Sequence, residues 1–276
     1  IYNKKLSGKA RPNIKFLKES LPGLLIRKKP EFEVVRDASY KFITSLVSRY
    51  ALNVKSWRVV CGLNAYNFFG FGFEQILEMT RAANMALKAE SPKAKRIVEV
   101  ANPWGEYYSA VPNTVPPLVY IDMMVQSGIS FDAFGIQLKF GKDLAGMHIR
   151  DLMQISASLD HFSILGKPLI ITEVEIPSEP GIDKENADIS GLWHGQWSQH
   201  LQSQWIEHFY KIAFSKFFVD TVIYSHLVDN KNCTITNSGL MTQELMPKES
   251  YQTLKELRKI IFSKQMESET HSQTDE

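Results

Sequence analysis

The sequence is poor in cysteine and has no long apolar run. These absences argue against a disulfide-rich protein and against a membrane-spanning one. Its 276 residues include only two cysteines, Cys61 and Cys233, which lie far apart and share no metal-ligand spacing. We expect these thiols to be small buried side chains or one chance pair rather than a disulfide framework. A membrane-spanning helix needs about eighteen or more consecutive apolar residues, and the sequence has no such run. We therefore expect no membrane partner.

A dominant charge sign is also missing. The chain has 32 basic and 30 acidic residues, and its basic residues are dispersed apart from those in the N-terminal forty. Nucleic-acid-binding domains gather basic residues on one face, so we expect no nucleic-acid partner. The histidines form no clustered ligand pattern. We expect neither a metal ion nor another cofactor.

What is present is a repeated alternation of strands and helices. Short β-branched runs are each followed by a loop and a longer amphipathic stretch, as expected for strands connected through helices. This alternation predicts a parallel sheet with helices outside, either doubly wound or closed into an eight-stranded barrel. The expected strands are Trp57–Cys61, Arg96–Ala101, Asp132–Leu138, Pro168–Thr172 and Val219–Tyr224, and the expected helices are 37–51, 73–90, 116–127, 149–164, 197–215 and 246–261.

The number of units is smaller than a complete barrel requires. A (β/α)8 barrel takes about 250 residues, yet only five clear units are visible here, with room for the end of one more strand in the first forty residues. An open barrel would leave two unpaired edges, so we expect further N-terminal strands outside this sequence. Residues 1–262 are interpreted as the C-terminal part of a TIM barrel, and 263–276 as a polar, disordered tail.

The residues just after the strands are rich in groups that bind sugars. Active sites of parallel barrels form at the carboxyl ends of the strands. Carboxylates can cleave glycosidic bonds, aromatic rings stack on pyranose rings, and amides bond to hydroxyls. This inventory predicts a carbohydrate site. Its members are Asn64, Trp104, Glu106, Gln137, Lys139, Glu173, Tyr224 and His226, with Trp193 and Trp197 in a long lid-like loop from Pro177 to Trp197.

From about Phe16 to Leu257, the chain resembles glycoside hydrolase family 10, the xylanase family, and especially its divergent bacterial members. The motifs that carry the resemblance occur in order and at barrel spacing. They are Trp57–Gly62 for the fourth-strand motif, Phe134–Gln137 for the sixth, Ile170–Val174 for the seventh, and Gly239-Leu240 with Pro247-Lys248 and Tyr251 for the closing segment. The resemblance implies a TIM barrel, a secreted or periplasmic location, and Glu173 as the catalytic nucleophile.

The departures from the family pattern concern catalysis directly. The family's acid/base glutamate and the asparagine before it are matched here by Gly62 and Cys61. Lys139 matches the histidine that supports the nucleophile, and beside Glu173 it would favour the ionised carboxylate. Loss of a general acid costs about 10²–10⁴-fold in rate. Glu106 follows the adjacent strand and is a candidate substitute acid.

Three functions follow from this reading. The first is a glycoside hydrolase resembling endo-1,4-β-xylanase that acts on a xylan-like polysaccharide, with Glu173 as nucleophile. The second is a catalytically inactive carbohydrate-binding pseudoenzyme on the same scaffold. The third is an unrelated barrel enzyme of the aldolase or phosphosugar type, which is disfavoured because no Gly-rich phosphate loop follows the final strands. The predicted binding set is Asn64, Trp104, Gln137, Lys139, Trp193, Trp197, Tyr224 and His226.

Overall fold

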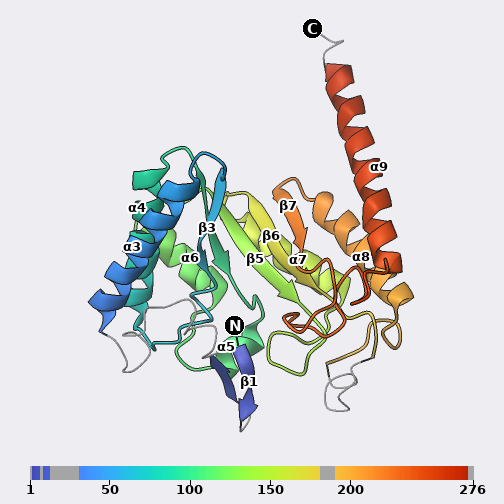
Figure 1. Cartoon of the computed structure of the whole chain (residues 1–276), viewed down its shortest axis with the longest axis horizontal. Helices are drawn as coiled ribbons and strands as arrows, with labels where there is room; N and C mark the ends of the chain where they lie inside the picture. The colour runs from blue at the N-terminus through green and yellow to red at the C-terminus, as the bar shows by residue number, and fades with distance from the viewer. Residues whose placement is uncertain (1, 7–8, 13–30, 181–189, 273–276) are drawn as a thin grey trace. The chain divides into compact units, whose positions relative to one another are not determined.

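The protein has an α/β fold with parallel strands, as the alternation predicted. The computed structural model describes residues 2–6, 9–12, 31–180 and 190–272, with side chains in 31–180 and 190–261. Five strands follow one another in chain order, β3-β4-β5-β6-β7 (Figure 1). The pairs β3/β4, β4/β5 and β6/β7 are parallel. The strands are β3 (Ser56–Cys61), β4 (Lys95–Val100), β5 (Ala133–Lys139), β6 (Leu169–Glu175) and β7 (Val219–Tyr224).

Helices separate these strands along the chain, and all six predicted helices are present. They are α3 (Phe32–Tyr50), α4 (Phe73–Glu90), α6 (Pro117–Gln126), α7 (Leu152–Ser163), α8 (Gln199–Phe214) and α9 (Glu249–Ser272), and a short α5 (Gly105–Ala110) is added after β4. Within the described part of the chain, no helix is both long and apolar enough to cross a membrane.

The chain divides into two compact units. The N-terminal unit comprises Ile1–Gln137 and Leu165–Pro168, and the C-terminal unit comprises Leu138–Ile164 and Leu169–Glu276. The division passes through β5, whose residues up to Gln137 belong to the first unit and whose last two belong to the second.

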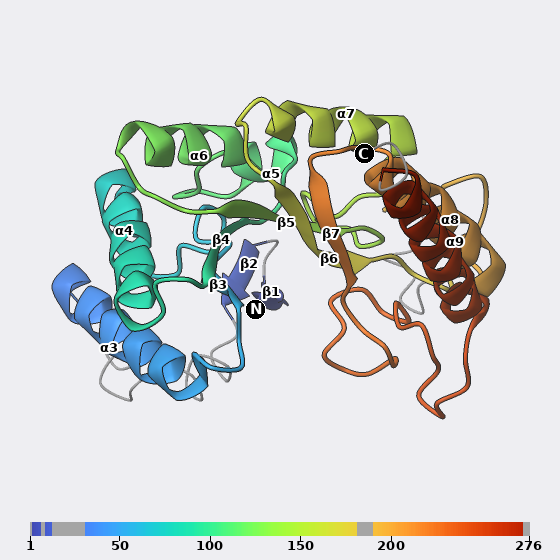
Figure 2. The ribbon, with the colours of Figure 1, turned by 90° about the horizontal axis from the view of Figure 1, so that it is seen from above.

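In the N-terminal unit, α3 and α4 lie side by side, as both ribbon views show (Figure 2). Helix α4 buries Ile76, Leu77, Thr80 and Leu87. This spacing places the four side chains on one face of a helix with 3.6 residues per turn. The helix begins after Gly72, whose amide donates to the Gln75 side chain at 3.0 Å. Strand β4 is buried along its last four residues, which suits a strand covered on both faces.

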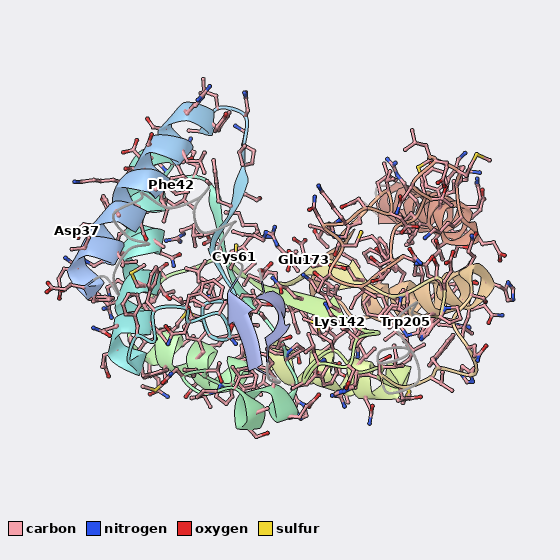
Figure 3. All side chains as sticks on the ribbon, turned by 60° about the horizontal axis from the view of Figure 1, so that its bottom comes forward. Asp37, Phe42, Cys61, Lys142, Glu173 and Trp205 are labelled. Atoms are coloured by element: carbon pink, nitrogen blue, oxygen red, sulfur yellow. The ribbon has the colours of Figure 1, made fainter. Side chains whose placement is uncertain are left out.

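In the C-terminal unit, α8 and α9 pack against each other (Figure 2). Helix α8 begins after Ser198, whose hydroxyl accepts from the Leu201 amide at 3.1 Å, an N-cap. Its inner face buries Trp205 and Phe209 completely, and their stacked rings have centroids 4.8 Å apart. Trp205 is labelled in Figure 3. Both residues therefore belong to the core of this unit, whereas Phe214 at the end of the helix is 39% exposed.

Several boundaries differ from the expected ones for local reasons. Strand β6 continues through Glu175, so Glu173 lies within the strand rather than after it. Helix α7 begins later than expected because Asp151 is its N-cap and accepts from the Met153 amide at 2.7 Å. Near the N-terminus, Tyr2–Leu6 (β1) and Lys9–Pro12 (β2) form a separate antiparallel pair. Helix α9 extends to Ser272, well into the segment 263–276 that the sequence assigns to a tail.

Candidate active site

Glu173 and Glu175 lie on β6 in the C-terminal unit, and both contact the side chain of Lys139 at the end of β5. The Lys139 ammonium forms an ion pair with Glu173 and lies 3.5 Å from Glu175 Oε1. The Glu173 side chain keeps 24% of its surface exposed, whereas that of Glu175 keeps 1%. One carboxylate is therefore open to solvent and the other is enclosed, and a single cation stabilises the charge of both.

The enclosed carboxylate of Glu175 organises the segment that follows β7. Its Oε2 accepts a hydrogen bond from the Ile235 amide at 2.9 Å and lies 3.5 Å from the Ser238 hydroxyl. Its Oε1 lies 3.7 Å from His226 Nε2, the predicted site histidine. Lys139 also donates to the Thr234 hydroxyl at 3.4 Å. The structure thus brings Lys139, Glu173 and His226 together around Glu175, which is not among the residues predicted for the site.

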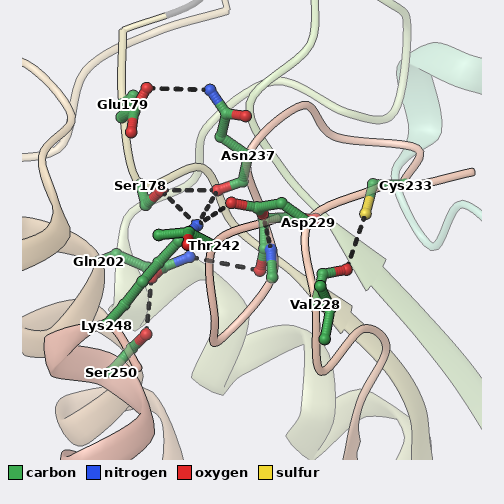
Figure 4. Close-up of polar contacts among 12 residues, drawn as sticks. Ser178, Glu179, Gln202, Val228, Asp229, Cys233, Asn237, Thr242, Lys248 and Ser250 are labelled. Carbon is green, nitrogen blue, oxygen red and sulfur yellow. Dashed lines mark hydrogen bonds and ion pairs between the residues drawn. The ribbon is translucent and has the colours of Figure 1, made fainter. Parts of the chain in front are cut away.

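A buried ion pair between Lys248 and Asp229 also stabilises the segment between β7 and α9. The Lys248 ammonium is fully buried and contacts Asp229 Oδ2 at 2.6 Å, the Ser178 hydroxyl at 2.9 Å and the Asn237 carbonyl at 3.2 Å (Figure 4). Asp229 Oδ1 accepts from the Gly239 amide at 2.7 Å. An ammonium group has three donors, and all three are used here. The connection from β7 to α9 is therefore held by charge at its centre.

Tyr224, a predicted substrate-binding residue, forms hydrogen bonds within the C-terminal unit. Its hydroxyl donates to the Ser238 carbonyl at 2.7 Å and accepts from Gln202 Nε2 at 3.3 Å. Burial raises the pKa of Tyr224 well above its usual value, so the phenol stays neutral.

The predicted lid tryptophans are mostly buried. Trp193 is 7% exposed and Trp197 3% exposed, while residues 181–189 of the predicted lid-like loop lie outside the described residues. Trp193 lines a shallow pocket of about 470 Å³ that also includes Asp151, His194 and His208, beside the start of α7 and along α8. Of the three described groups in the charged cluster, Lys139, Glu173 and Glu175, none lines this pocket.

In the N-terminal unit, a chain of polar side chains crosses β3, β4 and β5. Arg58 Nη1 donates to Glu99 Oε2 at 2.6 Å, and Gln137 Nε2 donates to Glu99 Oε1 at 2.6 Å. The Tyr66 hydroxyl in turn donates to Gln137 Oε1 at 3.1 Å. Glu99 is fully buried. Sequence reasoning found Gln137 but missed Glu99 and Tyr66, although a glutamate inside the apolar run of β4 is a signal because a buried charge needs partners.

Asn64, another predicted binding residue, is fully buried and ties two loops together. Its amide nitrogen donates to the Tyr108 hydroxyl at 2.7 Å, and its oxygen accepts from the Ala101 amide at 3.1 Å. Burial raises the pKa of Tyr108 above its usual value. Trp104 is half-buried and caps α5, and Glu106 is a half-buried residue in the first turn of that helix. Both follow β4, as predicted.

Gly62 and Cys61, which the sequence resemblance matches to the family's acid/base glutamate and the asparagine before it, lie at the end of β3, and other atoms already fill the space around Gly62. A Cβ added to Gly62 would lie 2.8 Å from two ring carbons of Tyr66 and 2.9 Å from the Ala101 Cβ. Its φ of +62° also favours glycine. Cys61 is exposed at the end of β3, so the prediction that both thiols are buried is wrong for this residue.

Comparison with solved structures identifies the fold. An endoxylanase of glycoside hydrolase family 10 from a sugarcane soil metagenome matches with a TM-score of 0.58 and 19% identity, over 83% of this chain and 69% of that one. Xylanase 10B from Thermotoga maritima matches with a TM-score of 0.63 and 18% identity, over 91% and 79%. The chain has the fold of these xylanases. A xylobiose complex of xylanase 10B from Thermotoga petrophila is similar, with a TM-score of 0.60 and 19% identity over 88% and 76%.

The match covers the five strand–helix units, so the expected TIM-barrel type is confirmed, and five units are consistent with an incomplete barrel. The resemblance to family 10 is confirmed at the level of the fold. No family model matches the chain, and no curated protein matches it by sequence.

Proposed function

We propose that this chain is a xylanase-like glycoside hydrolase that cleaves β-glycosidic bonds in a plant polysaccharide such as xylan, with Glu173 as nucleophile. The observation that carries the proposal is the partly exposed carboxylate of Glu173, ion-paired with Lys139 at the ends of β6 and β5, on a fold shared with endoxylanases. In parallel barrels this end of the strands holds the active site. A glycosidase nucleophile must be ionised and reachable, and this carboxylate has an adjacent cation and open surface.

In the proposed reaction, one Glu173 oxygen attacks the anomeric carbon while the bond to the leaving oxygen breaks, which gives a glycosyl ester. The leaving oxygen takes a proton from an acid, and water then hydrolyses the ester. Lys139 holds the carboxylate in place, and Glu175 fixes Lys139 through its own charge. Glu106 is the proposed substitute acid, since it lies in the first turn of α5 directly beyond β4.

The remaining predicted binding residues contribute unequally to this proposal. Trp104 is the proposed stacking platform because it is half-buried in a loop directly after β4. Gln137 and His226 are proposed to contact substrate hydroxyls. For Asn64, Trp193, Trp197 and Tyr224, burial and internal hydrogen bonds support a positioning role behind the substrate surface.

Hydrolysis of an aryl β-xyloside and of xylan tests the proposal, with Glu173→Gln as the decisive variant. Removing a nucleophile costs several orders of magnitude, so we expect the variant to lose at least about 10³-fold in kcat/KM. Glu179→Gln is the matched control, because Glu179 is an exposed carboxylate just beyond the same strand. If the wild type cleaves neither substrate, or if both variants retain its activity, catalysis by Glu173 is wrong.

A second candidate is a carbohydrate-binding protein without turnover. The specific observation in its favour is the filled space at Gly62, where an added Cβ would lie only 2.8 Å from the Tyr66 ring, so this position has neither a carboxylate nor room for one as the side chains stand. Titration of xylohexaose by calorimetry, run beside the hydrolysis assay, separates the two candidates. Binding without product would support this second function.

A further inference from the structure

We infer that the shallow pocket beside the start of α7 and along α8 is a second carbohydrate-binding site, which holds a sugar unit of a polysaccharide outside the charged cluster around Glu173. The class of ligand rests on the proposed function, although the pocket uses none of the proposed catalytic residues. Trp193 was predicted from the sequence as part of a lid-like loop, and the small exposed part of its ring belongs to the wall of this pocket.

The pocket has the size and the lining of a small-ligand site. Its volume is about 470 Å³, and ligand pockets typically have roughly 300–1,000 Å³. Its walls come from three segments of the C-terminal unit, namely the start of α7, the loop before α8 and one face of α8. The apolar lining residues are Leu152, Met153, Trp193 and Ile212, and the polar ones are Asp151, His194, Gln204 and His208. A mostly apolar hollow with a few polar groups is the usual composition of a binding site.

The polar groups of the pocket are open to a ligand. The side chains of His194, Gln204 and His208 form no hydrogen bond to another residue in the described part of the chain. Trp193 is 7% exposed, and its indole nitrogen is likewise without a partner among the described residues. The other four tryptophans have fully enclosed indole nitrogens, and that of Trp193 is not among them. The exposed part of this nearly buried ring therefore includes a hydrogen-bond donor.

Ring contacts gather these groups around Trp193. The centroid of the His194 ring lies 4.4 Å from that of Trp193, and the centroid of the His208 ring lies 6.2 Å from it. Gln204 precedes His208 by four residues on α8, so the two side chains share one face of the helix. A donor and several groups that both donate and accept thus lie on neighbouring parts of one wall.

The charges of the lining favour a neutral ligand with many hydroxyl groups. The described lining residues include one acid, Asp151, and no lysine or arginine, so an anion would find no matching charge. One Asp151 oxygen accepts from the Met153 amide, which leaves the other to accept from a hydroxyl. A purely apolar ligand is disfavoured because the polar groups would lose water without gaining partners. Sugar hydroxyls both donate and accept, and the carbon-bound hydrogens of a sugar ring suit the apolar wall.

The position of the pocket explains what a second site would contribute. Trp193 lies in the connection that leads from β6, the strand of Glu173, to α8. The pocket therefore belongs to the same unit as the proposed catalytic carboxylate, and a polysaccharide is long enough to contact both. A second contact on one polymer raises its overall affinity without changing the chemistry at the first. A small substrate that fills only the catalytic site gains nothing from the pocket.

Binding of the full chain to insoluble xylan, measured by depletion from solution at 4 °C, tests this inference. Gln204→Ala and His208→Ala each remove a pocket group from an exposed position on α8, where alanine is a good helix former. We expect the double variant to bind xylan about 3- to 10-fold more weakly, because one or two neutral hydrogen bonds are lost. Its kcat/KM for an aryl β-xyloside should equal that of the wild type.

The control and the possible outcomes keep the pocket separate from catalysis. His200→Ala removes an exposed histidine of the same helix that does not line the pocket, and it should bind xylan as the wild type does. All variants should keep the wild-type thermal midpoint within a few degrees. If the double variant binds xylan as tightly as the wild type, or if the wild type does not bind xylan, the second site is overturned.

The aryl β-xyloside assay decides the proposed function independently. If the double variant loses activity on this small substrate as much as it loses xylan binding, the pocket is part of the catalytic site and the inference of a second site is wrong. If the wild type cleaves neither the xyloside nor xylan, while the double variant alone loses xylan binding, the proposed hydrolase function fails and the binding site stands.

Discussion

The two compact units treat charge at their strand ends differently. In the C-terminal unit, Lys139 contacts two carboxylates, one of which stays partly exposed. In the N-terminal unit, the charge of Glu99 is buried. Its carboxylate accepts a hydrogen bond from the Gln137 amide, which in turn accepts one from the Tyr66 phenol. The first arrangement leaves the charged Glu173 carboxylate partly exposed to solvent. In the second, the buried charge of Glu99 fixes the orientation of the neutral Gln137 amide. The comparison teaches that the two units use a buried carboxylate differently: Glu175 holds a cation beside a partly exposed carboxylate, and Glu99 orients a neutral amide.

The largest expected effect concerns the ion pair that anchors the charged unit. Asp229→Ala leaves the fully buried Lys248 ammonium without its carboxylate, so we expect the free energy of unfolding to fall by about 3–5 kcal/mol. Urea denaturation measures this change. Glu207→Ala is the control, because its exposed pair with Lys211 contributes only about 0–1 kcal/mol. Equal losses in the two variants would mean that Lys248 is solvated and that the comparison of charge between the units fails.

A smaller effect is expected at Gly62 in the N-terminal unit. Gly62→Ala places a Cβ against Tyr66 and Ala101 and strains a positive φ, so we expect a loss of about 1–3 kcal/mol by urea denaturation. Gly128→Ala isolates the backbone strain, because Gly128 has a φ of +67° and nothing within 4 Å of an added Cβ. The difference between the two variants measures the steric contact alone. A difference of zero would show that Tyr66 moves aside readily.

The smallest effect belongs to a surface pair in the N-terminal unit. Arg96 bonds to Asp132 and lowers the pKa of this carboxyl below its usual value. A depressed carboxyl pKa stabilises the fold above the unfolded pKa, and that stability is lost as the pH falls through the folded pKa. With Asp132 partly exposed, Asp132→Asn should cost less than about 1 kcal/mol at pH 7, and nothing once Asp132 is protonated in acid. A cost that persists in strong acid would point to the hydrogen bonds instead of the charge.

Much of the fold was predictable because its signals are local. The apolar runs of β4 to β6 and the periodic faces of α4 and α8 each carry their own pattern, and the predicted α4 has the observed bounds. The place of Glu173 near the carboxyl end of a strand was predictable to within three residues for the same reason, since β6 continues only to Glu175, and its catalytic role stays a prediction. The polar chain ending at Tyr66 was not, because Arg58, Glu99 and Gln137 come from three strands. Only the folded sheet places them together.

Each unit contains one free cysteine that a thiol-reactive reagent can label. Cys61 belongs to the N-terminal unit and is exposed, whereas Cys233 belongs to the C-terminal unit and is half-buried. Burial raises the pKa of the Cys233 thiol, so less of the reactive thiolate forms at neutral pH. A limiting amount of an alkylating dye therefore attaches first to the end of β3, and slower labelling at the second thiol reports on transient opening of the other unit.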